Sequence, residues 1–191
     1  MHAMLWRRLD TPGHDACRLV ELGEGWRVEG TAIFRHEGQP AQLRYRVTAD
    51  PTWRSEHGEV TGWIGDAPVN LSIVRQPDGE WTINGLPVPD VRGCIDLDLA
   101  FTPATNLFAL RRLALEIGDG ADAPAAWLDI DTWRLVPLPQ RYERRTESSY
   151  WYEAPSVGYA ELIEVTDVGF VAQYTNLWTV ESLAAGGRAT V

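Results

Sequence analysis

The stretch WRVEGTAIFRH, residues 26–36, alternates between apolar and polar side chains over most of its length. Trp26, Val28 and Phe34 would lie on one face of an extended chain, and the charged side chains mostly on the other. This repeat of two residues is typical of a half-buried β-strand, whereas an amphipathic helix repeats every 3.6 residues. The stretch QLRYRVTAD, residues 42–50, has the same pattern, and a turn sequence separates the two. Together they predict a β-hairpin.

Segments of this kind continue along the chain and are separated by turns rich in glycine, proline and aspartate. No window of a dozen residues carries a helical apolar stripe. Because about ten to twelve antiparallel strands exceed what a flat sheet holds, the sheet should curl. We therefore predict an all-β fold, a single-domain antiparallel sheet curled into a β-roll or a partly open barrel, with little helix. The strands are expected at residues 16–22, 26–36, 42–50, 53–64, 69–75, 80–84, 94–101, 111–117, 126–136, 140–153, 158–166 and 168–180.

The length of 191 residues, 45% of them hydrophobic, predicts one domain over 1–191, with its core at about 16–180. The formal net charge of -10 disfavours nucleic acid and anionic membrane surfaces as partners, because both attract basic proteins. No apolar run approaches the roughly 20 residues of a bilayer-spanning helix, and the N-terminal sequence has no export signal. We therefore predict a cytoplasmic protein that is not embedded in a membrane. The tail SLAAGGRATV, residues 182–191, is expected to be disordered.

Motifs for cofactors and metals are missing from the sequence. The two cysteines, Cys17 and Cys94, form neither a disulfide framework nor a metal-binding pair, so we expect small buried thiols. Glycine-rich phosphate loops, nucleophile elbows and zinc-protease motifs do not occur. The sequence therefore predicts no cofactor and no metal.

The stretch CIDLDLAF, residues 94–101, places two carboxylates on one face of a predicted strand. Asp96 and Asp98 would lie roughly 6 to 7 Å apart at Cα, opposite a face of leucine and phenylalanine side chains. Two interpretations stay open. The carboxylates take part in acid–base chemistry or hold a hard cation, or they line a solvated face and pair with arginines of the next strand.

The residues that follow, TPATNLFALRRL, contain a turn and an arginine pair. Asn106 is interpreted either as a turn-former or as a ligand contact. Arg111 and Arg112 would point to opposite faces if a strand resumed there. One of them would then need an inward anion, either an aspartate across the hairpin or a ligand headgroup.

Four segments of the sequence resemble a known family. They are GCIDLDLAFTPATNLFALRRL (93–113), AAWLDIDTWRLVPLPQRYER (125–144), YWYEA (150–154) and VTDVGFVAQYTNLW (165–178). Together they are similar to the family named putative glycolipid-binding, over about residues 16–180. The most specific positions are Gly93, Cys94, Asp96, Asp98, Thr102, Pro103, Thr105, Asn106, Arg111 and Arg112. The resemblance implies a rolled antiparallel fold that looks like lipoprotein-carrier and mycobacterial lipid-carrier proteins, a glycolipid ligand and no established catalytic residue.

A curled sheet with an apolar inner face offers a concave pocket for an acyl or glycolipid ligand. We therefore predict a lipid- or glycolipid-binding protein that is not an enzyme. Its aromatic side chains would line this cavity or fill the core. The predicted ligand-binding residues are Arg44, Tyr45, Trp63, Trp81, Asp96, Asp98, Asn106, Arg111, Trp133 and Tyr142. Two alternatives remain, a hydrolase or isomerase that uses Asp96 and Asp98 and a protein-interaction module.

Overall fold

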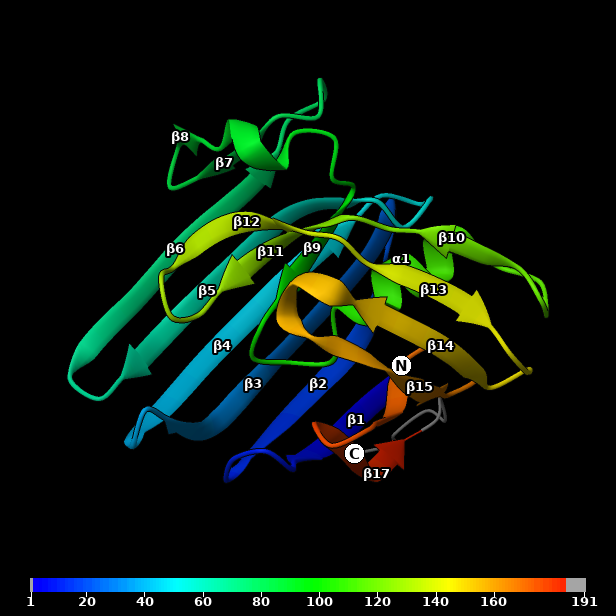
Figure 1. Cartoon of the computed structure of the whole chain (residues 1–191). Helices are drawn as coiled ribbons and strands as arrows, with labels where there is room; N and C mark the ends of the chain where they lie inside the picture. Colours follow the sequence, from blue (N-terminus) through cyan, green and yellow to red (C-terminus); the bar gives the residue numbers. More distant parts are fainter. Residues whose placement is uncertain (1, 185–191) are drawn as a thin grey trace.

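The structure is a computed structural model that describes residues 2–184. One large antiparallel sheet curls around a smaller sheet and a helix (Figure 1). The large sheet has 14 strands in the order β10-β13-β14-β15-β16-β17-β1-β2-β3-β4-β5-β6-β7-β8, and β8 and β10 are its two open edges. The prediction of an all-β chain with a curled antiparallel sheet and little helix is confirmed.

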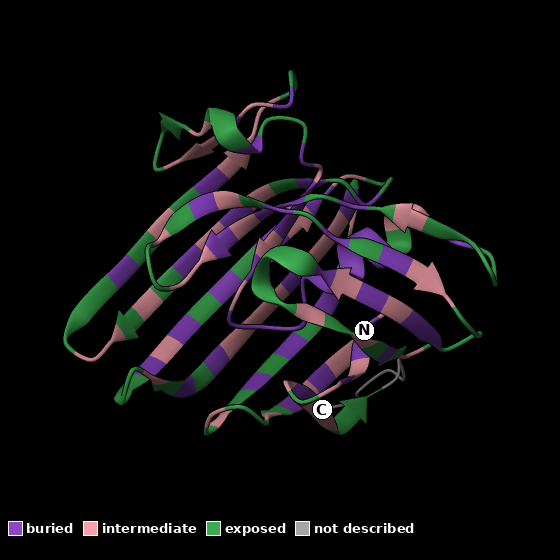
Figure 2. Cartoon of the chain, viewed as in Figure 1, coloured by how far each residue is buried: buried purple, intermediate pink, exposed green. Residues whose placement is uncertain are grey.

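The first half of this sheet is a run of antiparallel hairpins, long from β2 to β6 and short at β7 and β8. Its strands are β1 (His2–Arg8), β2 (Gly13–Leu22), β3 (Gly25–His36), β4 (Gln39–Ala49), β5 (Ser55–Ile64), β6 (Ala67–Arg75), β7 (Trp81–Ile83) and β8 (Leu86–Pro87). The predicted hairpin is β3–β4, in which Trp26 lies opposite Ala49 and Phe34 opposite Ala41. Buried and exposed residues alternate along these strands (Figure 2), as the sequence repeat of two residues predicts.

The second half of the sheet has shorter strands. They are β10 (Gly120–Asp122), β13 (Arg141–Arg144), β14 (Ser149–Ala154), β15 (Tyr159–Val165), β16 (Val171–Tyr174) and β17 (Trp178–Ala184). A short 3-10 helix, η2 (Pro155–Val157), connects β14 to β15. The two halves meet where β1 pairs with β17.

The concave side of the large sheet is filled by the middle of the chain. A three-stranded sheet of β9 (Asp96–Leu99), β11 (Ala125–Asp129) and β12 (Arg134–Leu138) lies there together with α1 (Asn106–Leu113), and a 3-10 helix η1 (Pro89–Val91) precedes it (Figure 1). Leu97 of β9 is fully buried and packs over Gly58 of β5, where a Cβ atom would come within 2.3 Å of the leucine side chain. The backbone N–H of Leu97 also donates to the Ser55 hydroxyl at 3.0 Å. The small sheet is therefore docked tightly, and protein side chains fill much of the interior.

Several predicted boundaries are wrong. The strand expected at 111–117 does not form, because α1 occupies 106–113 and buries Leu107, Phe108 and Leu110. The strands expected at 126–136, 140–153 and 168–180 are each divided into two by a turn, and β1 was not anticipated. Of the tail that was expected to be disordered, residues 182–184 continue β17, and 185–191 lie outside the described residues.

Within the described residues, no helix has the length and apolar character needed to cross a bilayer. Cys17 and Cys94 are both free and buried, as expected.

Candidate ligand-binding site

The strand β9 separates its side chains in the way that its sequence predicts. Leu97 and Leu99 are buried toward the large sheet, and Asp96 and Asp98 point the other way. Trp127 of β11 lies directly opposite Asp98 in the parallel β9–β11 pair, so its indole and this carboxylate project from the same face.

Asp98 is the centre of a chain of hydrogen bonds, here called the inner polar network. Its Oδ1 accepts from the Thr105 hydroxyl at 3.0 Å, and its Oδ2 accepts from Nε2 of Gln140 at 2.9 Å. The Tyr142 hydroxyl donates to Oε1 of Gln140 at 2.9 Å and accepts from Nδ2 of Asn106 at 2.8 Å. Three residues predicted from the sequence, Asp98, Asn106 and Tyr142, therefore meet here.

Burial changes the acidity of this network. Burial raises the pKa of Asp98 to about 6, and the hydrogen bonds from Thr105 and Gln140 oppose the rise only in part. Burial likewise raises the pKa of the Tyr142 hydroxyl well above its usual value. Asp98 therefore changes its charge in the mildly acidic range, and Tyr142 stays a neutral donor.

The second aspartate of β9 has a different role. Nη2 and Nε of Arg112 donate to the two carboxylate oxygens of Asp96 at 2.6 and 3.1 Å, which gives a bidentate ion pair. Burial raises the pKa of Asp96, although Arg112 opposes the rise. An arginine partner was one of the two interpretations for these aspartates, but it comes from α1 and not from a strand. The pair fixes the helix to the small sheet.

A hollow of about 130 Å³, here called the inner pocket, opens beside this network. Its polar lining comes from Asp98, Thr102 and Asn106, and its aromatic lining from Trp127, Tyr152, Tyr174 and Trp178. An engineered cavity of about 150 Å³ holds one benzene molecule, so the inner pocket has room for about one six-membered ring. It is smaller than the roughly 300 to 1,000 Å³ of sites that enclose a whole drug-sized ligand.

Sequence reasoning did not find most of the pocket lining. Tyr152 lies opposite Tyr142 in the β13–β14 pair, with ring centroids 4.8 Å apart, and Tyr174 lies 5.6 Å from Tyr152. The only available signal was the repeat of two residues in these short strands, which places their tyrosines on inner faces. No local sequence pattern marks Gln140 or Trp127 as part of a site, because contacts between distant segments bring them to Asp98.

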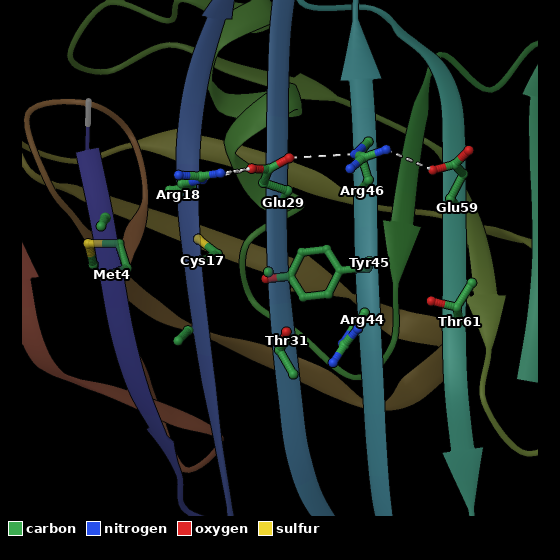
Figure 3. Close-up of a pocket in the computed structure, with 13 residues that line it drawn as sticks. Met4, Cys17, Arg18, Glu29, Thr31, Arg44, Tyr45, Arg46, Glu59 and Thr61 are labelled. Atoms are coloured by element: carbon green, nitrogen blue, oxygen red, sulfur yellow. Dashed lines mark hydrogen bonds and ion pairs between the residues drawn. The ribbon is translucent and has the colours of Figure 1, made fainter.

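The predicted residues Arg44 and Tyr45 lie elsewhere, in the wall formed by β2–β5. Arg44 is exposed on the outer face of the sheet, beside a shallow hollow of about 630 Å³ (Figure 3). Tyr45 is buried, and its hydroxyl donates to Oδ2 of Asp15 at 2.8 Å. Both residues line this hollow, and neither lines the inner pocket.

The predicted tryptophans also lie apart from the inner pocket. Trp81 is 0% exposed and donates from Nε1 to the Cys94 carbonyl at 3.0 Å, so it fills the core. Trp63 is 39% exposed on β5, and Trp133 follows β11 in a turn with φ at 56°. Arg111 is exposed on α1, where its guanidinium lies over the Trp53 ring.

Asp15 connects the wall of the sheet to the pocket, which the sequence did not indicate. The Thr102 hydroxyl donates to Oδ2 of Asp15 and accepts from the backbone N–H of Ala104 at 3.0 Å. Burial raises the pKa of Asp15 to about 6, against the effect of Thr102 and Tyr45, and its Oδ1 has no hydrogen-bond partner among residues 2–184. Since Thr102 lines the inner pocket, Asp15 anchors the turn that shapes it.

Comparison with known proteins agrees with this architecture. The family described as "Putative glycolipid-binding" matches residues 3–180, and the chain belongs to this family. The resemblance found in the four sequence segments is therefore confirmed. A DUF1089 family protein from Pseudomonas aeruginosa has a similar crystal structure, with a TM-score of 0.78 and 26% sequence identity over 87% of this chain and 91% of that chain. Among curated proteins, no relative matches.

Proposed function

We propose that the protein binds a glycolipid without catalysing a reaction, and that one sugar ring of the ligand occupies the inner pocket. The observation that carries the proposal is the composition of this pocket. A carboxylate, an amide and several aromatic rings converge on a space for about one ring. The family to which the chain belongs supports the class of ligand.

The pocket has the chemical groups that a sugar ring needs. Asp98 accepts two hydrogen bonds inside the protein, but a carboxylate has about four acceptor positions, so capacity remains for sugar hydroxyls. Asn106 adds amide atoms on the same side. The apolar face of the sugar would pack on Trp127 or Trp178, since aromatic side chains offer broad apolar surfaces.

The acyl chain belongs outside the inner pocket in this proposal. The concave interior is filled by β9, β11, β12 and α1, and the inner pocket is too small for a ring and a long chain. Val157 of η2 lines the pocket and is 49% exposed, and Leu177 lines it nearby. These apolar side chains give the start of the chain a surface along the pocket mouth.

The geometry of the aspartates supports binding over catalysis. Acid–base chemistry with two carboxylates requires both to reach the substrate. Asp96 is held by two hydrogen bonds from Arg112 and does not line the inner pocket. Asp98 alone faces the proposed ring.

Titration with matched amphiphiles tests the proposal. Octyl glucoside, below its micelle concentration, should give a saturable change in tryptophan fluorescence, and octyl sulfobetaine, which lacks the sugar, should not. Asp98→Asn should weaken binding of the glucoside about tenfold, because it removes charge-assisted hydrogen bonds. Asp66 is exposed in the turn between β5 and β6. Asp66→Asn is therefore a matched control, and it should bind the glucoside as the unmodified protein does.

Two results would contradict the proposal. One is equal binding of the two amphiphiles, which would mean that the sugar is not recognised. The other is unchanged glucoside binding by Asp98→Asn. Native mass spectrometry of protein purified without detergent adds an independent readout, in which a bound glycolipid should be detected.

A further inference from the structure

A second hollow, here called the end cleft, opens where turns at one end of the large sheet meet α1. Its volume is about 500 Å³, within the roughly 300 to 1,000 Å³ of small-molecule sites. Trp26, Trp53 and Leu19 contribute apolar lining, and Glu21, Arg111 and Asp167 contribute charged lining. It has no lining residue in common with the inner pocket.

Its aromatic side is built as a stack. The Trp26 and Trp53 rings lie 4.4 Å apart at 11° to each other, and the guanidinium of Arg111 lies 5.0 Å from the centre of the Trp53 ring. The stem of Arg111 also packs against Gly169, where a Cβ atom would come within 3.2 Å of the arginine Cδ. These two contacts place the Arg111 guanidinium beside the aromatic stack.

The backbone that presents Trp53 is held in an unusual conformation. Trp53 has φ at 68°, a region that large side chains rarely adopt. The Asp50 carboxylate accepts from the backbone N–H groups of Thr52 and Arg54 at 2.8 and 3.0 Å and from the Thr52 hydroxyl at 2.7 Å. The Trp53 N–H donates to the Asp50 carbonyl at 2.9 Å. Strained backbone of this kind is common at binding sites.

The charges of the end cleft are unpaired. Arg111, Glu21 and Asp167 are all exposed, and none of them forms an ion pair within residues 2–184. The neighbouring Arg112, in contrast, has a carboxylate partner. A guanidinium donor and two carboxylate acceptors around an indole suit a ligand with many hydroxyl groups. Two carboxylates oppose an anionic ligand, and the guanidinium opposes a cationic one.

We propose that the end cleft is a second carbohydrate site, which binds a neutral sugar ring against Trp26. Arg111 donates to sugar oxygens, and Glu21 and Asp167 accept from sugar hydroxyls. The proposal shares only the class of ligand with the proposed function, and the end cleft can bind sugar even if the inner pocket does not.

Methyl glycosides of neutral hexoses test the end cleft without a lipid part. Their binding is followed by saturation-transfer NMR and by the indole N–H signals of the tryptophans. Arg111→Gln and Trp26→Leu should each raise the dissociation constant about tenfold. Because Trp26 also packs against the core, the surface change at Arg111 keeps the test valid if the tryptophan variant folds poorly. The matched control is Arg35→Gln, at another exposed arginine, and it should leave binding unchanged.

Three results would overturn the proposal. The first is a lack of saturable binding of every glycoside at concentrations well above millimolar. The second is binding that Asp98→Asn abolishes but Arg111→Gln leaves intact, which would place the sugar in the inner pocket alone. The third is binding of phosphocholine but not of glycosides, which would make the end cleft a site for zwitterions.

Discussion

Carboxylates and arginines pair in two regions of the molecule, buried in one and exposed in the other. The inner polar network and its neighbour Asp96 lie inside the curled sheet, whereas a row of alternating charges crosses the outer face of β2, β3, β4 and β5 (Figure 3). This row is made of Arg18, Glu29, Arg46 and Glu59. Inside, the side chain of Asp96 is 3% exposed, and outside, that of Arg46 is 52% exposed.

The pKa values of the carboxyl groups in the two regions shift in opposite directions. Burial raises the pKa of Asp96 despite the bidentate Arg112. Partial burial also acts to raise the pKa of Glu29, but hydrogen bonding by Arg18 and the charges of Arg27 and Arg46 hold it below its usual value. For Asp96, the loss of water on burial affects the pKa more than its bidentate arginine does. For Glu29, the loss of water is smaller, and several arginines together affect the pKa more. Whether an ion pair stabilises this protein therefore depends on how deeply its two side chains are buried.

The largest expected effect comes from Arg112→Ala. It leaves the buried Asp96 carboxylate without its hydrogen-bonded partner, with only the more distant charge of Arg75, which should lower the free energy of unfolding by about 3 to 5 kcal/mol. Urea denaturation measures the loss, and Arg46→Ala on the outer row is the matched control, with less than about 1 kcal/mol expected. Similar losses in the two variants would refute the comparison.

The next effect concerns Asp15, the other deeply buried carboxyl. Because its pKa is raised to about 6, the folded protein binds this proton more tightly than the unfolded chain does. The stabilisation is complete below the usual pKa of 3.8 and is lost as the pH rises through about 6. Asp15→Asn should therefore raise the free energy of unfolding by at most about 2 to 3 kcal/mol at pH 7 and weaken its dependence on pH between 5 and 7.

The asparagine can be accommodated at this position. Its amide oxygen can accept from Tyr45 and Thr102 as the carboxylate does, but its NH₂ group, in the place of Oδ1, is a buried donor that needs an acceptor, which reduces the gain. Urea denaturation at pH 5, 6 and 7 gives the measurement. A loss of stability at pH 7 with an unchanged pH profile would show that Asp15 titrates normally.

A smaller effect is expected where the small sheet is docked. In Gly58→Ala, the added methyl group meets Leu97, and overpacking of this kind costs about 1 to 3 kcal/mol. Since Leu97 and Asp98 are neighbours on β9, the displacement should also weaken glucoside binding. The control is Gly23→Ala in an open turn, where no atom of the described chain lies within 4 Å of the new methyl group. Full affinity in a destabilised Gly58→Ala protein would mean that the inner pocket does not depend on this contact.

The smallest effect is expected on the outer row. Glu29→Gln should change the free energy of unfolding by less than about 1 kcal/mol, because ion pairs with exposed arginines contribute little. Because the pKa of Glu29 is lowered, its stabilisation is present above the usual value of 4.5 and is lost as the pH falls through the lower folded value. Added salt should reduce the difference from the unmodified protein further. A difference that is large and insensitive to salt would contradict this ranking.

Local sequence patterns predicted the long strands of the large sheet well. The repeat of two residues identified β3 and β4 and assigned their inward side chains, because the long strands of the sheet have one buried and one exposed face. The helix α1 was missed because its eight residues are too few for a helical stripe to appear in a window of a dozen. Arg111 and Arg112 were therefore assigned to a strand.

Most of the predicted residues that meet in the candidate site come from one local segment, and Tyr142 of the inner polar network is the exception. Asp98 and Asn106 come from the same stretch as the most specific family positions, and both line the inner pocket. Trp127 reaches Asp98 through the pairing of β11 with β9, and Gln140 reaches it by a hydrogen bond from a distant part of the chain, which no local pattern encodes. A large apolar residue has the same sequence pattern in a core as in a cavity, and Trp81 is fully buried in the core.

The pairing of β1 with β17 has a consequence for how the chain acquires its fold. Ala3 lies opposite Ala184, and Arg8 lies opposite Trp178. Most neighbouring strands within each half are also neighbours in sequence, so hairpins can form early and locally. The contact between the first and last strands requires closure of almost the whole chain, which makes it a late step in folding. During synthesis the two halves therefore cannot join until β17 has left the ribosome.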